Sequence, residues 1–297
     1  MRKMLPSAIA LSVALTVPAL AADLPALKAP PYVPPPPLWT GFYAGLNAGG
    51  TFSTGSGVAN SSGDLYDDYA PAAAGAAGAL SALVSGSGIS NNSGVLGGGQ
   101  VGYNFQFQQN LVVGLEADLQ GLSGSNSGVV VGAAPDPRAT ATQMVTTGQY
   151  NASLDYLGTL RGRAGFLLSP TWLAYATGGL AYGGGNLSAT FATVDAAGVY
   201  GPGFGPSTYA QTRVGWTVGA GVEWMFLPNW SARVEYLYYD LGTVTTNSVV
   251  AGLNNGTGTV GYAYGTSTSA NFNGHILRAG VNYHFNWSSP APVIAKY

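Results

Sequence analysis

Eight charged residues share one face of the alternating apolar runs in this chain, and in the run 154–168 Asp155 has an odd-numbered position like two of them and is expected on the same face. In the run 111–119 the apolar positions are odd-numbered and the two acids are even-numbered, and later runs show the same opposition of charged and apolar positions. Because successive side chains of a strand point to opposite faces, these charges all fall on one face of a sheet. Equal numbers of acids and arginines indicate ion pairing. The residues are Glu116, Asp118, Arg161, Arg163, Glu223, Arg233, Glu235 and Arg278.

The two histidines are the other candidates for acid–base chemistry. Alternation in the last run places His275 on the apolar side near one rim, and His284 on the charged side at the opposite end. A barrel esterase or acyltransferase would need a histidine beside a serine and a carboxylate. Ser267, Ser269 and Asp240 are the residues that would have to approach His275. A histidine without a catalytic role is the favoured interpretation, so we expect no enzyme.

Other motifs give no cofactor or metal site. Residues 97–102 match the G-x-G-x-x-G spacing, but that motif requires a strand before it and a helix after it, whereas here the alternation simply continues. No G-x-S-x-G nucleophile elbow is present. Asp64, Asp67 and Asp68 would attract divalent cations, but their spacing matches no ligand loop, and a solvated acidic loop is favoured. The chain has no cysteine, which excludes thiolate sites and disulfides.

The elements that must position the charges are separated by very unequal connections. A compact soluble domain rarely carries several structureless loops longer than about 15 residues. Outer-membrane barrels combine short periplasmic turns with long extracellular loops. We therefore expect an all-β transmembrane barrel of eight antiparallel up-and-down strands with long extracellular loops. The short turns are 108–110, 169–171 and 227–229, and the long connections are 53–93, 123–153, 187–211 and 245–270.

Composition favours the same fold class. Charged residues make up 7% of the 297 residues, against about 25% in soluble proteins. No stretch after the N-terminus offers about 18 uninterrupted apolar residues, so strands rather than helices must cross any bilayer. Nucleic-acid binding is not expected, because it requires a clustered basic face.

The chain divides into four expected regions. Residues 1–21 read as a cleaved signal peptide, with Arg2 and Lys3 before an apolar core and a small-x-small site at 19–21. Residues 22–38 form a proline-rich periplasmic leader that favours extended polyproline II. Contact of this leader with the cell wall is conceivable, although an unstructured leader is favoured. Residues 39–287 form the barrel, and 288–297 form a short tail.

Aromatic residues cluster beside the short turns and the chain ends of the expected barrel. Such residues concentrate where a bilayer meets water. In a soluble sandwich they would instead lie along strand centres. We expect these membrane-interface aromatics to be Trp39, Phe42, Phe105, Phe107, Trp172, Trp224, Phe226, Trp230, Tyr283 and Phe285.

The charged face must line the lumen. An eight-stranded barrel has a lumen just wide enough to be filled by side chains, and buried charges persist only when paired. We therefore expect an ion-pair network that plugs the lumen, with hydrogen bonds completed by Gln100, Asn104, Thr159 and Thr217. Separate, water-solvated pairs are the alternative.

Five segments together resemble the small porin-like outer-membrane proteins of alphaproteobacteria. The resemblance implies an eight-stranded outer-membrane barrel, usually an abundant surface protein with envelope-integrity or porin-like roles. Members often finish at the aromatic that closes the last strand, but here Phe285 is followed by residues 286–297. The barrel-assembly machinery would read either Phe285 or Tyr297. The segments are 39–49, 157–165, 215–224, 234–242 and 277–285.

Two functions remain open at this point. The first is a non-enzymatic surface protein of the cell outer membrane, in contact with membrane lipids and lipopolysaccharide, that contributes to envelope structure. The second is a small or gated diffusion porin. The equal count of acids and arginines on the luminal face favours the first, because a selective pore more plausibly lines its wall with one sign of charge.

Overall fold

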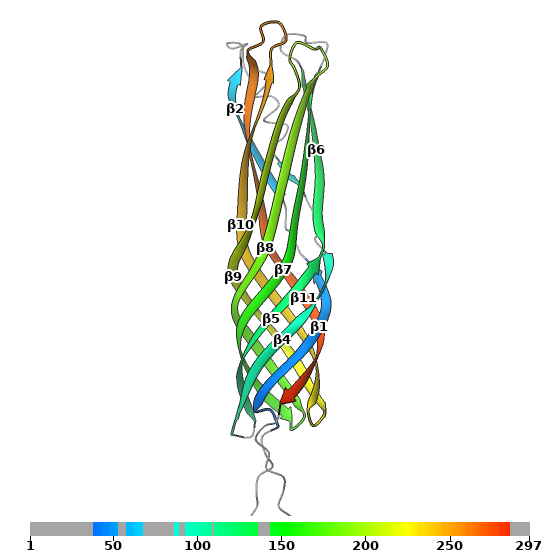
Figure 1. The fold of residues 1–297 in the computed structure, drawn as a ribbon, viewed down its shortest axis with the longest axis vertical. Coiled ribbons are helices and arrows are strands. Elements are labelled where there is room, and N and C mark those ends of the chain that lie inside the picture. The colour runs from blue at the N-terminus through cyan, green and yellow to red at the C-terminus, as the bar shows by residue number, and fades with distance from the viewer. Residues whose placement is uncertain are drawn as a thin grey trace, which may run out of the picture. The chain divides into compact units, whose positions relative to one another are not determined.

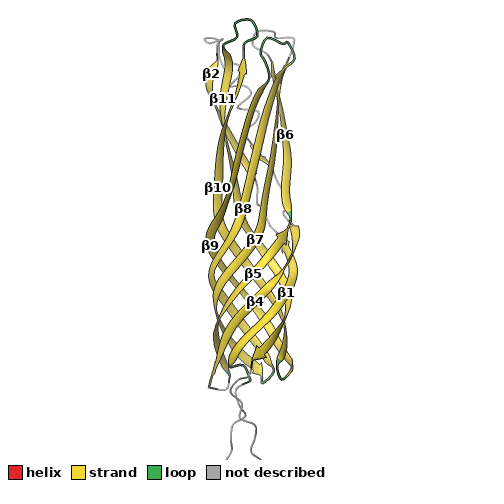
Figure 2. Cartoon of the chain, viewed as in Figure 1, coloured by secondary structure: helices red, strands yellow, loops and turns green. Residues whose placement is uncertain are grey.

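The computed structural model describes residues 38–52, 58–67, 86–88, 93–108, 110–135 and 143–285. Every regular element among them is a strand (Figure 2). No helix in these ranges is long and apolar enough to cross a membrane. The expected signal peptide (1–21), the leader (22–38) except for Leu38, and the tail (288–297) lie outside the described residues.

Eight strands close into a ring, as expected (Figure 1). Each pairs antiparallel with its neighbours, and the first pairs with the last through Phe42–Phe285 and Phe52–His275. The ring strands are β1 (Gly41–Phe52), β4 (Ser93–Phe107), β5 (Leu111–Ser123), β7 (Gln143–Ser169), β8 (Trp172–Asp195), β9 (Gly203–Leu227), β10 (Trp230–Leu253) and β11 (Val260–Phe285). Three shorter strands extend the sheet: β2 (Val58–Asp67), β3 (Gly86–Gly88) and β6 (Ser125–Pro135).

Outward-facing rings on the strands mark a band of bilayer height. On β1, Phe42 lies at the turn end and Phe52 about ten residues further along, and both are exposed. The same spacing recurs on four other strands. Ten residues of a tilted strand span about 25 Å, the height of the apolar band of an outer-membrane barrel. The other pairs are Phe166 and Tyr156, Trp172 and Tyr182, Phe226 and Trp216, and Phe285 and His275.

The expectation of structureless long loops is wrong for most of their length. Strands β7 to β11 are 24 to 27 residues long and continue through most of the ranges 143–153, 187–211 and 245–270. The β7–β8 ladder runs to Met144–Asp195. Abundant Gly, Ser, Thr and Asn suggested loops, but apolar side chains such as Met144, Leu187 and Phe191 recur at inward positions, and these segments pack as strands. About 12 residues beyond the band extend the sheet by roughly 40 Å.

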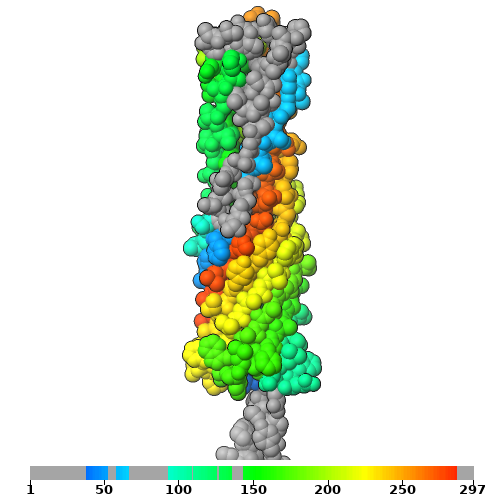
Figure 3. Space-filling view, turned by 180° about the vertical axis from the view of Figure 1, so that it is seen from behind, coloured from blue at the N-terminus to red at the C-terminus, as the bar shows by residue number. Residues whose placement is uncertain are grey.

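Beyond the band the ring divides into two sheets. The β9–β10 ladder ends at Trp216–Asp240, and the register shifts between Asp240 and Thr243. One sheet is then β6-β7-β8-β9, and the other is β10-β11-β2-β3. Figure 3 shows β11 beside β1 and β2 on one face of the molecule. Where the ladder stops, the Arg213 guanidinium donates hydrogen bonds to the carbonyl oxygens of Leu241 and Thr243.

The space between these two sheets is apolar, unlike the space inside the band. We call this part, above the end of the β9–β10 ladder, the distal sandwich. The interior therefore changes along the axis: charged residues and apolar layers share it within the band, whereas beyond the band it is mainly apolar. The fully buried residues of the distal sandwich include Met144, Leu187, Phe191, Val250, Tyr262 and Tyr264.

Two arginine substitutions on the same face of β7 test the position of the band. Leu160 is 52% exposed at mid-band, and Gln149 is exposed in the distal sandwich. Leu160→Arg should lower the free energy of unfolding by about 2–4 kcal/mol, because it places a cation in hydrocarbon. Gln149→Arg should change it by less than about 0.5 kcal/mol, as at ordinary surfaces. Urea unfolding of protein refolded into vesicles measures both, and equal effects would contradict the assignment.

Candidate functional site in the barrel lumen

Cross-strand register brings opposite charges together inside the band. Glu116 of β5 pairs with Arg161 of β7, and Glu223 of β9 pairs with Arg233 of β10. Opposite charges at directly facing positions attract one another. All eight of the charged residues expected in the lumen lie there, and none is more than 4% exposed. We call these eight residues the luminal network.

Arg161 forms ion pairs with three carboxylates of this network. Its Nη2 lies 2.8 Å from Asp118 Oδ2 and also contacts Glu116, while its Nη1 lies 3.0 Å from Glu235 Oε1. Its Nε donates to the hydroxyl oxygen of Thr159 at 2.9 Å. Every nitrogen of this guanidinium thus has an acceptor, and the acceptors are three carboxylates and one hydroxyl. This is the arrangement that offsets the cost of burying a charge.

Arg278 repeats this pattern from the opposite wall. Its Nε donates to Glu235 Oε2 at 2.8 Å, and its Nη2 lies 2.8 Å from Asp118 Oδ2. Its Nη1 donates to Gln120 Oε1 at 3.1 Å. Asp118 and Glu235 are therefore shared by two arginines, so the pairs form one connected cluster.

Two further arginines extend the cluster toward the short turns. Arg163 Nη2 lies 2.7 Å from Glu223 Oε2, and Arg233 Nη1 contacts Glu116. The Tyr43 hydroxyl donates to Glu116 Oε2 at 2.6 Å and accepts from Arg163 at 3.1 Å. The Arg163 guanidinium also lies 3.9 Å from the centre of the Tyr175 ring, a cation–π distance.

A polar group below these arginines closes the turn end. Glu223 Oε1 accepts hydrogen bonds from Ser231 and Asn282, the latter at 2.7 Å. His284 lies inward, as expected, with its Nε2 2.9 Å from Ser231 Oγ. The edge of Trp39 packs against the imidazole at 5.7 Å between ring centres.

The prediction that Trp39 is a membrane-interface residue is wrong. Trp39 is fully buried, and its indole N–H donates to the Pro170 carbonyl at 3.0 Å. It precedes β1 rather than lying within it, so strand alternation does not direct its side chain outward. It packs instead against Val112, Leu173 and Met225 inside the barrel mouth.

The other nine aromatics of that set lie on the outer face of the ring. Each is between 37% and 58% exposed. They are Phe42, Phe105, Phe107, Trp172, Trp224, Phe226, Trp230, Tyr283 and Phe285.

The expected supporting residues behave differently from one another. Gln100 Nε2 donates to Asn282 Oδ1 at 2.7 Å, and Thr159 accepts from Arg161. Thr217 instead donates to the Tyr238 carbonyl. Asn104 is fully buried, and its side-chain atoms have no partner among the described residues.

The sequence reasoning missed Tyr43 and Tyr175 as luminal residues. The signal was available in the glycines: Tyr43 faces Gly102 across the β1–β4 ladder, and Tyr175 faces Gly221 across the β8–β9 ladder. A Cβ on Gly102 would overlap the Tyr43 ring. A glycine that pairs with an inward tyrosine on the neighbouring strand thus makes room for the tyrosine ring in a narrow lumen.

An apolar layer lies directly above the luminal network. Leu157 pairs in register with Gln120, and Leu237 pairs with Ile276 two positions beyond Glu235. These three apolar side chains are 0% exposed. Charged and apolar layers therefore fill the lumen in succession.

The described residues do not form the catalytic, cofactor-binding or metal-binding sites considered from the sequence. His275 lies 2.6 Å from the Tyr236 hydroxyl and stacks on the Phe52 ring. Ser269 donates to a backbone carbonyl, and Asp240 accepts from the Gly242 amide. Residues 97–102 are extended strand. Within the described ranges, no three His, Cys, Asp or Glu residues are grouped to hold a metal ion; Asp68 lies outside those ranges.

Comparisons with known proteins agree with this fold. A family model described as outer membrane protein beta-barrel domain matches residues 7–285. The 31 kDa outer-membrane immunogenic protein of Brucella melitensis biotype 1 is 32% identical over 251 residues, which cover 83% of this chain and 84% of that protein. The 22 kDa outer membrane protein of Rhizobium leguminosarum bv. viciae is 34% identical over 145 residues, 48% of this chain and 52% of that protein.

Two solved structures were also matched. Neisserial surface protein A gives a TM-score of 0.31 at 13% identity, over 83% of this chain and 98% of that one. The outer membrane protein OprG from Pseudomonas aeruginosa gives a TM-score of 0.33 at 12% identity, over 83% of this chain and 97% of that one. The family match spans nearly all of the chain, and the Brucella relative covers most of it. This chain therefore belongs to the outer membrane protein β-barrel domain family, and it is an integral protein of the bacterial outer membrane.

Proposed function

We propose that this protein is a non-enzymatic structural protein of the outer membrane, with a closed lumen and a rigid extracellular projection. The observation that carries the proposal is the burial of the luminal network, in which no charged side chain is more than 4% exposed. In a water-filled channel such side chains would face solvent. Barrels with wide aqueous channels have about 16 strands, twice the number in this ring.

The distal sandwich supports a role at the cell surface. The short turns lie at the periplasmic end of such barrels, so the sandwich lies outside the cell. It extends roughly 40 Å beyond the band and has its own apolar core. The Brucella relatives are named as immunogenic proteins, which fits a family that exposes ordered structure at the surface. Membrane lipids surround the band, lipopolysaccharide surrounds the base of this projection, and the barrel-assembly machinery inserts the protein; any cell-wall contact would come from residues 22–38.

A small or gated diffusion pore is the second candidate. One observation favours it: Arg233 Nε and Nη2 and both side-chain polar atoms of Asn104 have no hydrogen-bond partner in the described part of the chain. Buried polar atoms of this kind are normally paired with protein or ordered water. A luminal network with spare donors has alternative pairings available to it.

A deletion strain separates the two functions. Loss of a structural barrel should lower resistance to detergent and hypo-osmotic shock, with uptake of small hydrophilic solutes unchanged. Expression of the wild-type chain should restore resistance. A fall in solute uptake with unchanged envelope resistance would contradict the structural role and support the pore.

The stability of the barrel should depend on Arg161. Arg161→Ala leaves Glu116, Asp118 and Glu235 without one of their cations, at a cost of about 3–5 kcal/mol for a dry network. Arg213→Ala is the matched control, because the bonds of Arg213 to described residues go to carbonyl oxygens outside the network; it should cost less than about 1.5 kcal/mol. A heat-modifiable gel shift measures both effects on stability, as the temperature at which the fast-migrating folded species disappears from the gel. An unchanged temperature for Arg161→Ala would show that Arg161 is solvated.

A further inference from the structure

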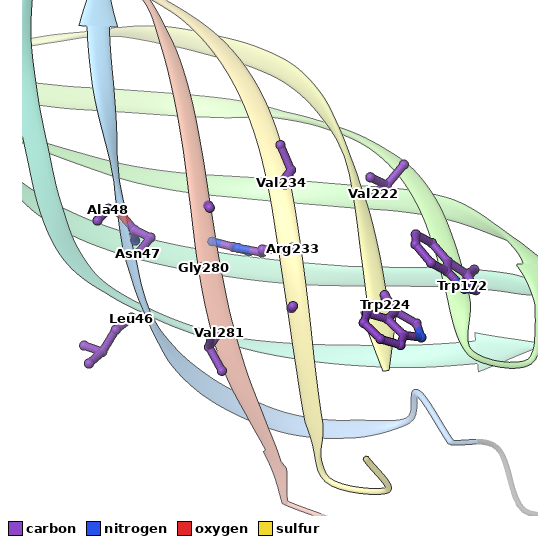
Figure 4. A pocket seen from close by; sticks show the side chains of 12 residues that line it. Leu46, Asn47, Ala48, Trp172, Val222, Trp224, Arg233, Val234, Gly280 and Val281 are labelled. Carbon is purple, nitrogen blue, oxygen red and sulfur yellow. The ribbon is translucent and has the colours of Figure 1, made fainter. Parts of the chain in front are cut away.

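A hollow lies on the lipid-facing surface of the barrel. The hollow has a volume of about 730 Å³ and crosses five strands from β1 to β8 by way of β11, β10 and β9. In Figure 4, Leu46 lies at one end, Val234 and Val281 lie in the middle, and Trp172 and Trp224 lie together at the other end. We call this hollow the lipid groove.

The lipid groove exists because small side chains meet in register between larger ones. Ala48 of β1 pairs with Ala279 of β11, and Ala232 of β10 pairs with Val281 of β11. The three alanines form a low floor. Leu46 and Val281 rise beside them, and none of the outward-facing side chains that line the groove is charged.

Two tryptophans close the periplasmic end of the groove. Trp172 and Trp224 pair across β8 and β9, with parallel rings 5.6 Å apart. Each is about 42–44% exposed, and no hydrogen bond of either indole N–H is found among the described residues. Both belong to the aromatic ring beside the periplasmic turns, where an indole places its N–H toward lipid headgroups. The other end, at Ala48, lies near mid-band, between Phe42 and Phe52.

We propose that the lipid groove binds one acyl chain of an inner-leaflet glycerophospholipid, whose ester and phosphate oxygens accept hydrogen bonds from the Trp172 and Trp224 indoles. The groove runs from the periplasmic interface to mid-band, which is the depth of one leaflet. Its exposed lining is apolar, because the two polar residues that also line it, Asn47 and Arg233, are buried and bond luminal partners. Its interfacial end offers the donors that a headgroup needs. Lipopolysaccharide is excluded as the source, because it occupies the other leaflet.

A second barrel is the less suitable occupant. A neighbouring barrel is convex, and Leu46, 73% exposed at the rim, would hold it away from the alanine floor. A flexible acyl chain follows the floor without a complementary ridge. The proposal uses only the barrel's place in the membrane, so it does not depend on whether the lumen conducts.

Native mass spectrometry of the detergent-solubilised protein tests the proposal. The delipidated full barrel is titrated with palmitoyl-oleoyl phosphatidylethanolamine, and the wild type should retain one lipid. Ala279→Leu and Ala232→Leu fill the groove and should weaken retention about tenfold or more. Because both add apolar surface on the lipid face, the barrel should still fold, as a heat-modifiable gel shift verifies. Ala176→Leu is the control: Ala176 is exposed on β8 within the band and does not line the groove.

The outcomes are distinct. Retention lost in the two groove variants and kept in Ala176→Leu would support the site. Equal retention in all variants, or equal loss in all of them, would mean non-specific annular lipid and would overturn the proposal. A dimer in the wild type that disappears in Ala279→Leu would identify a second barrel as the occupant and would also overturn it. The double variant Trp172→Phe and Trp224→Phe removes both indole N–H groups but keeps an aromatic ring at each position, and it should reduce lipid retention. Unchanged retention would refute the headgroup contact.

Discussion

The pairing of buried charges is the interaction on which the rest of this barrel depends. Four arginines and four acids occupy a lumen too narrow for bulk water, and a charge left alone there costs several kcal/mol. Pairing satisfies them only if the strands hold fixed registers, such as Glu116 opposite Arg161 and Glu235 opposite Arg278. A slip of one residue would turn every charge of a strand toward lipid, so the luminal network also specifies strand register.

The surroundings of the chain explain why the interior changes along its axis. Within the bilayer band the outer face must be apolar, so the polar face of each strand is left to the lumen. Beyond the band the outer face meets water, and the hydrophobic effect then favours apolar side chains inside. The strands do not end at this boundary; they divide into two sheets near Asp240 and enclose a second core. One set of strands thus serves a membrane barrel and an extracellular sandwich.

Alternation and turn length were sufficient to predict the eight-stranded ring and the inward direction of these eight charges. The same alternation was wrong for Asp155, which is exposed because the register shifts between Leu154 and Leu157. Alternation and turn length were insufficient for the distal sandwich, because the outer face of its strands is largely polar or small and the inner face mixes apolar residues with Gly, Ser and Thr, so the contrast that marks a membrane strand is missing. The partners of each charge also required structure: Arg161 contacts Glu235 across 74 positions of sequence, which no spacing rule anticipates. Trp39 was misplaced because it stands just before the strand, where alternation no longer applies.

Single-channel recording in planar bilayers tests the closed lumen most directly. Refolded wild-type protein, verified as folded by its heat-modifiable gel shift, should give no reproducible conductance steps beyond rare picosiemens flickers. In the proposed closed lumen, the charged and apolar layers would leave ions no continuous aqueous path. Reproducible nanosiemens steps from verified barrels would contradict this, and would mean that the luminal network opens in the membrane and that the protein is a pore.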